Sequence, residues 1–176
     1  MQKHLYTKEF KKVVDKEFNA LLNKGTFEYI DKSKVDKQEP LLLMWVFTYK
    51  FDQDGYLIKY KAQLVARGDL QYTIEDTYAA TLTAQIFRAI IAIIVAFDLE
   101  TCQYNTINAF ANASLPNPIA CECAKGYDKP RFILRILQAL YRLKISLVLW
   151  YKEFIITLEN LGLYLVLGTN CLFMND

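Results

Sequence analysis

The segment Asp52–Gly55, with the sequence DQDG, constrains the fold more than any other part of the chain. Aspartate followed by glycine is typical of tight turns that connect two antiparallel strands. The second half of the preceding run, LLLMWVFTYKF, is rich in aromatic and β-branched residues. In the following run, YLIKYKAQLVARG, Leu57, Lys59 and Lys61 alternate with Ile58 and Tyr60. Two such runs around an Asp-Gly turn predict a β-hairpin.

Three segments have the apolar spacing of helices. Thr7 is placed to cap a helix that extends to about Asn23, and Thr83 is placed to cap a second helix over Ala84–Phe97. In the third segment, residues 138–161, leucines and aromatic residues recur every three or four positions. This spacing predicts one long helix.

The remaining segments complete an α+β pattern. Loops are expected at 31–40 and 69–82, and a short helix at 108–115, broken by the prolines of 116–118. Strands are expected at 99–105 (LETCQYN), 131–136, 164–167 and 171–174. A hairpin followed by separated helices and strands favours the α+β class.

The helix expected over Ala84–Phe97 is apolar on every face, so we expect it to be buried. The longest strictly apolar run, Ala89–Phe97, is far shorter than the roughly 20 residues that a membrane-spanning helix needs. No basic and then apolar leader opens the chain. We therefore expect an intracellular protein without a transmembrane segment, in either the cytoplasm or the nucleus.

The net charge of +2 is unevenly distributed along the sequence. Residues 125–152 carry seven basic groups and one acidic group. This basic block either follows the phosphates of a nucleic acid or forms the solvated face of a helix. Its members are Lys125, Lys129, Arg131, Arg135, Arg142, Lys144 and Lys152.

The residues themselves offer little catalytic or metal-binding chemistry. The sequence contains no glycine-rich phosphate loop and no nucleophile elbow, and His4 is its one histidine. The pair in Cys121–Cys123 lacks the second pair of ligands that a structural zinc site needs. Asp98 and Glu100 are either Mg²⁺ ligands or markers of a helix end and a turn. Composition and spacing alone therefore predict an α+β domain, with an anionic polymer as its candidate partner.

Seven motifs in order resemble the reverse transcriptase domain of copia-type retrotransposons, over nearly the whole chain. WVFTYKFDQDGYLIKYKAQLVARGDLQ is similar to the fingers hairpin of that family, and CQYNTINAFANASL is similar to Q-x-D-V-x-x-A-F-L-N-G-x-L. LQALYRLKISLVLWY is similar to L-x-K-A-L-Y-G-L-K-Q-S-P-R-x-W-Y. The other matching segments are DKEFNALLNKGTFE, DTYAATLTAQIFRAIIAIIVAFDLE, IACECAKGY and LGLYLVLGTNCLF.

The resemblance implies a partial polymerase fold, with a fingers hairpin, an incomplete palm sheet with packed helices, and no thumb. It places an N-terminal helix and loop in residues 1–40, the fingers region in 41–82 and the partial palm in 83–176. We expect the long helix 138–161 to pack beneath the palm sheet. The activity implied is RNA-directed DNA polymerisation, for which intact members of the family use Mg²⁺.

Three residues match positions that bind the nucleotide in the family. The resemblance places Lys61 and Arg67 on the fingers strand that faces the triphosphate, and Phe110 beside the sugar. A lysine supplies a point charge for phosphate, and an arginine supplies a fork of donors. The alternative for Lys61 and Arg67 is that both are exposed residues of a hairpin. The alternative for Phe110 is that it is a core aromatic residue.

The departures from the family pattern concern catalysis. Asn105 occupies the position of the first metal-binding aspartate, and an amide does not balance the charge of a divalent cation as a carboxylate does. The second metal-binding element, Y-x-D-D, follows "CLF" in the family, whereas this chain ends at Asp176. Arg142 occupies a family glycine.

We therefore expect a degenerate fragment of a copia-type reverse transcriptase that is catalytically inactive and needs no cofactor of its own. Its expected partners are RNA or DNA, bound weakly and without sequence specificity, and the missing C-terminal half of the polymerase. One alternative is a remnant that binds nucleic acid or protein through the basic block 125–152. Another alternative is a polymerase that becomes active only when the missing C-terminal half completes it.

Overall fold

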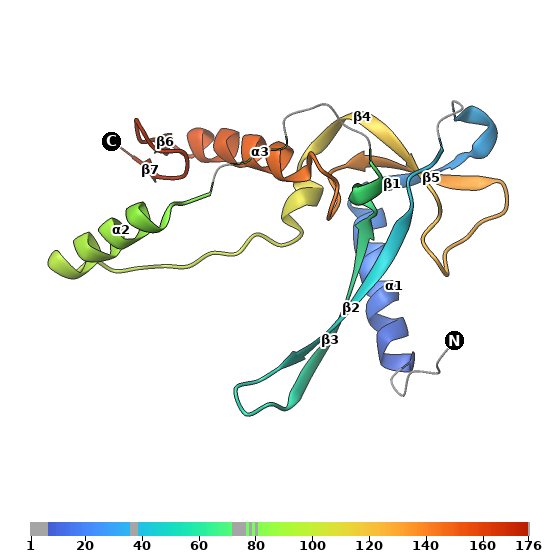
Figure 1. Ribbon diagram of the computed structural model, residues 1–176, viewed down its shortest axis with the longest axis horizontal. Helices are drawn as coiled ribbons and strands as arrows, with labels where there is room; N and C mark the ends of the chain where they lie inside the picture. The colour runs from blue at the N-terminus through green and yellow to red at the C-terminus, as the bar shows by residue number, and fades with distance from the viewer. Residues whose placement is uncertain (1–6, 36–38, 72–76, 78, 80, 176) are drawn as a thin grey trace.

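The computed structural model describes residues 7–35, 39–71, 77, 79 and 81–175 (Figure 1). His4, Asp176 and parts of the predicted loops 31–40 and 69–82 lie outside these residues. Within the described ranges, three α-helices accompany antiparallel sheets, so the predicted α+β class is confirmed. No helix in this part of the chain has the length and apolar character required to cross a membrane.

The predicted hairpin is confirmed. Strands β2 (Leu43–Phe51) and β3 (Leu57–Ala66) pair antiparallel around the expected turn. The Asp52 carboxylate holds this turn, because its Oδ1 accepts hydrogen bonds from the backbone N–H groups of Asp54 at 3.1 Å and Tyr56 at 2.7 Å. Gly55 completes the turn with a φ of +85°, which favours glycine.

Helix α1 (Thr7–Asn23) ends at the predicted residue and begins at Thr7 itself, which was predicted to cap it. It connects the hairpin to the main sheet. At one end, the buried Phe10 ring makes edge-to-face contacts with three rings of the hairpin, at centroid distances of 5.0–5.3 Å. Further along, Phe18 stacks on Tyr127 with ring centroids 3.7 Å apart. Aromatic packing thereby orients the hairpin relative to the core.

The core lies on a three-stranded antiparallel sheet in the order β1-β5-β4. These strands are β1 (Phe27–Asp31), β5 (Phe132–Gln138) and β4 (Ser114–Cys121). The central strand corresponds to the predicted strand 131–136, whereas the sequence analysis missed both edge strands. Pro116 and Pro118 did not end an element as predicted, because they lie within β4, where the pairing register shifts at the sheet edge.

The long helix predicted over 138–161 is shorter and lies elsewhere. Helix α3 spans Ser146–Asn160, because β5 extends to Gln138 and a turn occupies 139–145. Its main contacts are with the 3₁₀ helix η3 (Ala109–Asn112) and strand β6 (Tyr164–Leu165), and not with the underside of the sheet. Strand β6 pairs with β7 (Phe173–Met174), within the two predicted C-terminal strands.

Two further predictions are wrong. The segment 99–105 is exposed and contains no strand, although its composition predicts one. Helix α2 (Ala84–Ala96) begins after the predicted cap, where Thr83 Oγ1 accepts a hydrogen bond from the Ile86 N–H, yet none of its residues is buried. An apolar pattern indicates that a helix needs to be buried. It does not show whether other elements of the chain cover the helix. Figure 1 shows α2 well away from the sheet.

The backbone of Arg142 predicts a stabilising substitution. Its φ is +67°, in the left-handed region that costs a residue with a side chain about 1–2 kcal/mol. Arg142→Gly should remove most of this strain, and we expect the free energy of unfolding to rise by about 1 kcal/mol. Urea denaturation measures the change. Arg142→Lys, which retains both strain and charge, should bring no gain; a gain of equal size in both variants would contradict the explanation.

Candidate nucleic-acid interface

The end of β3 meets the turn 139–145 in a close backbone contact. The N–H of Ala66 donates a hydrogen bond to the carbonyl oxygen of Tyr141 at 2.9 Å. Two residues later, a Cβ on Gly68 would lie only 1.8 Å from the carbonyl oxygen of Arg142. Lys144 continues the contact, since its backbone N–H donates to the Gln71 side chain at 3.1 Å. Glycine at position 68 therefore permits an approach that any side chain would block.

This contact brings together Arg67, Arg142 and Lys144, here called the cationic cluster. All three residues are exposed or partly exposed, and Asp69 forms an ion pair with Arg67. The Lys144 ammonium donates to the carbonyl oxygen of Gln71. Arg67 binds Asp69 through two parallel hydrogen bonds, Nε to Oδ1 at 2.9 Å and Nη2 to Oδ2 at 2.7 Å. Among the residues that the structure describes, three cations against one carboxylate leave a local positive excess that attracts an anionic polymer.

The titration of Asp69 reflects this environment. Hydrogen bonding from Arg67 lowers the pKa of the Asp69 carboxyl, and the charges of Arg67 and Arg142 lower the pKa further. The same hydrogen bond raises the pKa of Arg67. Because Arg67 is held by Asp69, a phosphate must compete with this carboxylate for the guanidinium.

Phe110 lies against the same turn. Its ring, on η3, is half-buried and contacts the Tyr141 ring edge-to-face, at a centroid distance of 5.4 Å and an interplanar angle of 87°. Two of the three residues expected at a nucleotide therefore converge on the turn 139–145, although they are 43 positions apart in the sequence. The contact with Tyr141 agrees with the core-aromatic alternative, and contact with a sugar stays a prediction.

Lys61 is separate from the cationic cluster. Lys61 lies on β3, where it pairs in register with Thr48. It is six residues before Arg67, which corresponds to roughly 20 Å along an extended chain. Its charge acts on Glu17 of α1. Burial raises the pKa of the Glu17 carboxyl, while a hydrogen bond from the Leu64 backbone and the Lys61 charge oppose the rise. Lys61 thus lies on the strand against which α1 packs, and its triphosphate role stays a prediction.

The residues around Asn105 do not fit a pair of Mg²⁺ ions. Asn105 lies in the exposed segment 99–107, outside any sheet. Among the residues that the structure describes, no three His, Cys, Asp or Glu side chains gather closely enough to hold a metal ion. Asp98 directly follows the end of α2, as in the helix-end alternative. A neutral amide without neighbouring carboxylates offers a poor ligand set for a hard divalent cation.

The basic block 125–152 does not form one helix face. Arg135 lies on β5 and pairs with Glu28 of β1, and the Lys129 ammonium lies 3.7 Å from the centroid of the Tyr29 ring. Arg142 and Lys144 belong to the cationic cluster, and Lys152 lies on α3. Sequence reasoning missed the cluster because Arg67 is 75 positions before Arg142. The available signal was Gly68, two residues after the end of β3, since a glycine near a strand indicates a close backbone approach.

Comparison with known proteins identifies similar polyproteins. The chain is 27% identical over 157 residues to the retrovirus-related Pol polyprotein from transposon TNT 1-94 of Nicotiana tabacum, covering 86% of the chain and 12% of the polyprotein. It is 30% identical over 117 residues to that from transposon RE1 of Arabidopsis thaliana, covering 62% of the chain and 8% of the polyprotein. It is 28% identical over 172 residues to the transposon Ty1-DR4 Gag-Pol polyprotein of Saccharomyces cerevisiae, covering 92% of the chain and 10% of the polyprotein.

No protein-family model matches the chain. No solved structure matches it either. The polyproteins of three organisms nevertheless align with most of the chain, and each alignment covers 8–12% of the polyprotein. Homologues of this chain are therefore Pol polyproteins of retrotransposons, and the chain spans only a small part of their length.

Proposed function

We propose that the chain derives from the reverse transcriptase segment of a retrotransposon Pol polyprotein and has lost polymerase chemistry. The observation that carries the proposal is the order of seven reverse-transcriptase-like motifs, in a chain whose homologues are transposon Pol polyproteins. The hairpin β2–β3 with helix α1 is a candidate for the fingers, and the sheet β1-β5-β4 with η3 and α3 is a candidate for part of the palm.

The loss of chemistry rests on Asn105. Polymerases of this type position two divalent cations that stabilise the charge of phosphoryl transfer, and the first aspartate bridges them. The amide at position 105 carries no charge, and the described residues place no carboxylate cluster beside it. Primer extension on a primed RNA template tests this proposal, as set out in the Discussion.

A second function is weak, sequence-independent binding of nucleic acid by the cationic cluster. The observation that favours it is the convergence of Arg67, Arg142 and Lys144 beside the aromatic pair Phe110 and Tyr141. Cations track phosphates, and aromatic rings stack on exposed bases, so this combination suits a single strand of either RNA or DNA.

Binding should depend steeply on salt. A site that neutralises two or three phosphates on a single strand should give a slope of log affinity against log salt of about −2. Arg142→Gly and Lys144→Gln should each weaken binding several-fold and reduce the slope by about 0.7. Fluorescence anisotropy with labelled oligonucleotides of unrelated sequence measures both quantities.

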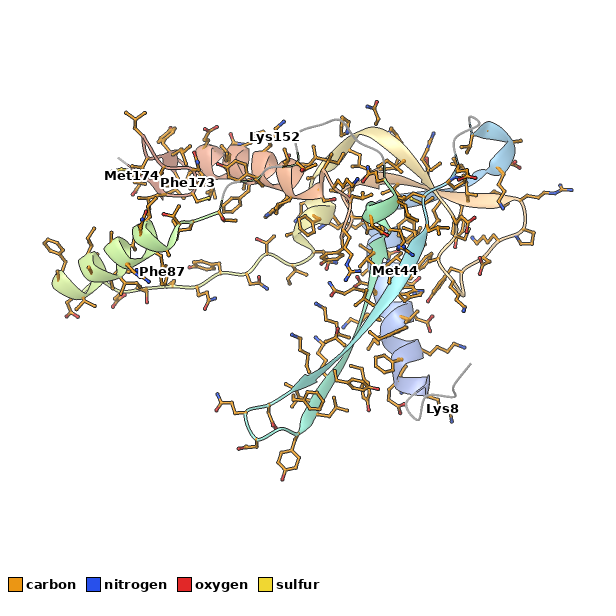
Figure 2. All side chains as sticks on the ribbon, in the orientation of Figure 1. Lys8, Met44, Phe87, Lys152, Phe173 and Met174 are labelled. Carbon is orange, nitrogen blue, oxygen red and sulfur yellow. The ribbon has the colours of Figure 1, made fainter. Side chains whose placement is uncertain are left out.

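Lys8→Gln is the matched control for this experiment. Lys8 is an exposed cation near the outer end of α1, far from the turn 139–145 in Figure 2. This variant should bind like the parent chain. Because Arg142→Gly is expected to stabilise the fold, its weaker binding would not reflect unfolding. Salt-insensitive binding, strong preference for one sequence, or an equal loss in Lys8→Gln would contradict the second function.

A further inference from the structure

The outer edge of strand β3 is covered by two different hydrogen-bond acceptors. In an antiparallel pair, every second residue directs both its N–H and its C=O away from the partner strand. Ala66 is such a residue, because its N–H donates to the carbonyl oxygen of Tyr141 at 2.9 Å. Two positions earlier, the N–H of Leu64 donates to the carboxylate of Glu17 on α1. The two acceptors therefore occupy neighbouring places along one strand edge, spaced by roughly 7 Å.

The Glu17 carboxylate is incompletely satisfied in this place. Glu17 follows Phe10 by seven residues, or two helical turns, so it lies on the face of α1 that packs on the hairpin. Figure 1 shows α1 beside β3, with which it makes most of its contacts. Within the described residues, the Glu17 Oε1 atom is buried and has no hydrogen-bond partner. A buried oxygen that carries charge without a donor disfavours the ionised form.

The neighbouring ionisable groups do not offset this cost. Burial raises the pKa of the Glu17 carboxyl, and the Leu64 hydrogen bond and the Lys61 charge on β3 oppose that rise only in part. From the turn 139–145, Tyr141 interacts with Glu17. Burial raises the pKa of the Tyr141 hydroxyl, and the Glu17 charge raises it further. Tyr141 thus stays neutral while Glu17 titrates, and it supplies no compensating charge.

We propose that Glu17 is a proton-dependent contact between α1 and the hairpin, which tightens when its carboxylate binds one proton. A protonated carboxyl loses the buried charge, keeps an oxygen that accepts from the Leu64 N–H, and gains an O–H donor. An acceptor for that donor is available on the same edge, because Leu64 directs its C=O outward together with its N–H. The contact goes beyond both functions proposed above and depends on neither.

Urea denaturation of the full chain, from neutral to acidic pH, tests this contact against Glu17→Gln. Glutamine imitates the protonated carboxyl, because it is uncharged and has both a donor and an acceptor. The folded chain retains a proton at a pH at which the unfolded chain has released it. Stability of the parent relative to Glu17→Gln should therefore fall as the pH rises through the raised pKa. The ratio of their unfolding constants should change by at most about tenfold per pH unit, the limit for one proton.

Glu153→Gln is the matched control, since Glu153 is exposed in the middle of α3. It should show no such gain at neutral pH. A carbon NMR titration should show the Glu17 carboxyl titrating above the ordinary range of a glutamate, which is about 4.3. Amide exchange locates the effect: relative to its intrinsic rate, exchange of the Leu64 N–H should slow as the pH falls in the parent, but not in Glu17→Gln.

Three results would each overturn the proposal. The first is a constant stability difference between the parent and Glu17→Gln over the whole pH range, or an equal gain in Glu153→Gln. The second is a Glu17 carboxyl that titrates in the ordinary range. The third is exchange of the Leu64 N–H that follows its intrinsic rate at every pH, which would separate the titration from the contact with the hairpin.

Discussion

Gly68→Ala is expected to destabilise the chain by about 3 kcal/mol or more. Its Cβ would lie 1.8 Å from the carbonyl oxygen and 3.0 Å from the carbonyl carbon of Arg142. Both are backbone atoms, so no side-chain rotation relieves the clash. The 139–145 turn would have to move by more than 1 Å, which disrupts the hydrogen bond from Ala66 to Tyr141. Overpacking of this kind typically costs about 1–3 kcal/mol, and rigid backbone on both sides places this site at the upper end.

Urea denaturation measures this loss. Leu70→Ala is the matched control, because Leu70 lies on the same 3₁₀ helix as Gly68 and is exposed. It should change stability by no more than about 0.5 kcal/mol. The alanine at 68 should also displace the cationic cluster and weaken nucleic-acid binding. Stability of Gly68→Ala within the range of the control would show that the close approach is not required.

Local signals in the sequence predicted the local structure well. The Asp-Gly turn predicted the hairpin, and Thr83 predicted the start of α2, because the hydrogen bonds involved lie within a few residues. Non-local features were harder to predict. The segment 99–105 has strand-forming residues, but a strand also requires a partner, and no described strand pairs with it. The same reasoning applies to α2, none of whose residues is buried by the described part of the chain.

The candidate site was only partly predictable. The resemblance identified Arg67 and Phe110, and the structure places both at the turn 139–145. It did not reveal that Asp69, two residues along the chain, holds the Arg67 guanidinium. It also did not reveal that Glu17 of α1 lies where the Lys61 charge lowers its pKa, which depends on how α1 packs on the hairpin. The departure at Arg142 does have a structural correlate, since its φ of +67° suits the glycine of the family pattern.

The central claim is that this chain has a reverse-transcriptase-like sequence without polymerase chemistry. Loss of one preorganised electrostatic contributor typically reduces the rate of an enzyme by about 10²–10³-fold. In the proposed ancestry, Asn105 stands where the family pattern has a metal-binding aspartate. Restoring that charge with Asn105→Asp should rescue nothing. Residue 105 lies in an exposed segment, and the described residues bring no group of ligands together that would share a metal ion with it.

Primer extension on a primed homopolymer RNA template, with Mg²⁺ or Mn²⁺ and deoxynucleotides, tests this claim most directly. A reverse transcriptase of known activity shows that the template and primer are competent, and a reaction without protein sets the background. We predict that the chain and its Asn105→Asp variant both remain at background. Extension by the chain as given would contradict the claim, and extension by the variant alone would show that the metal ions find other carboxylates in this fold.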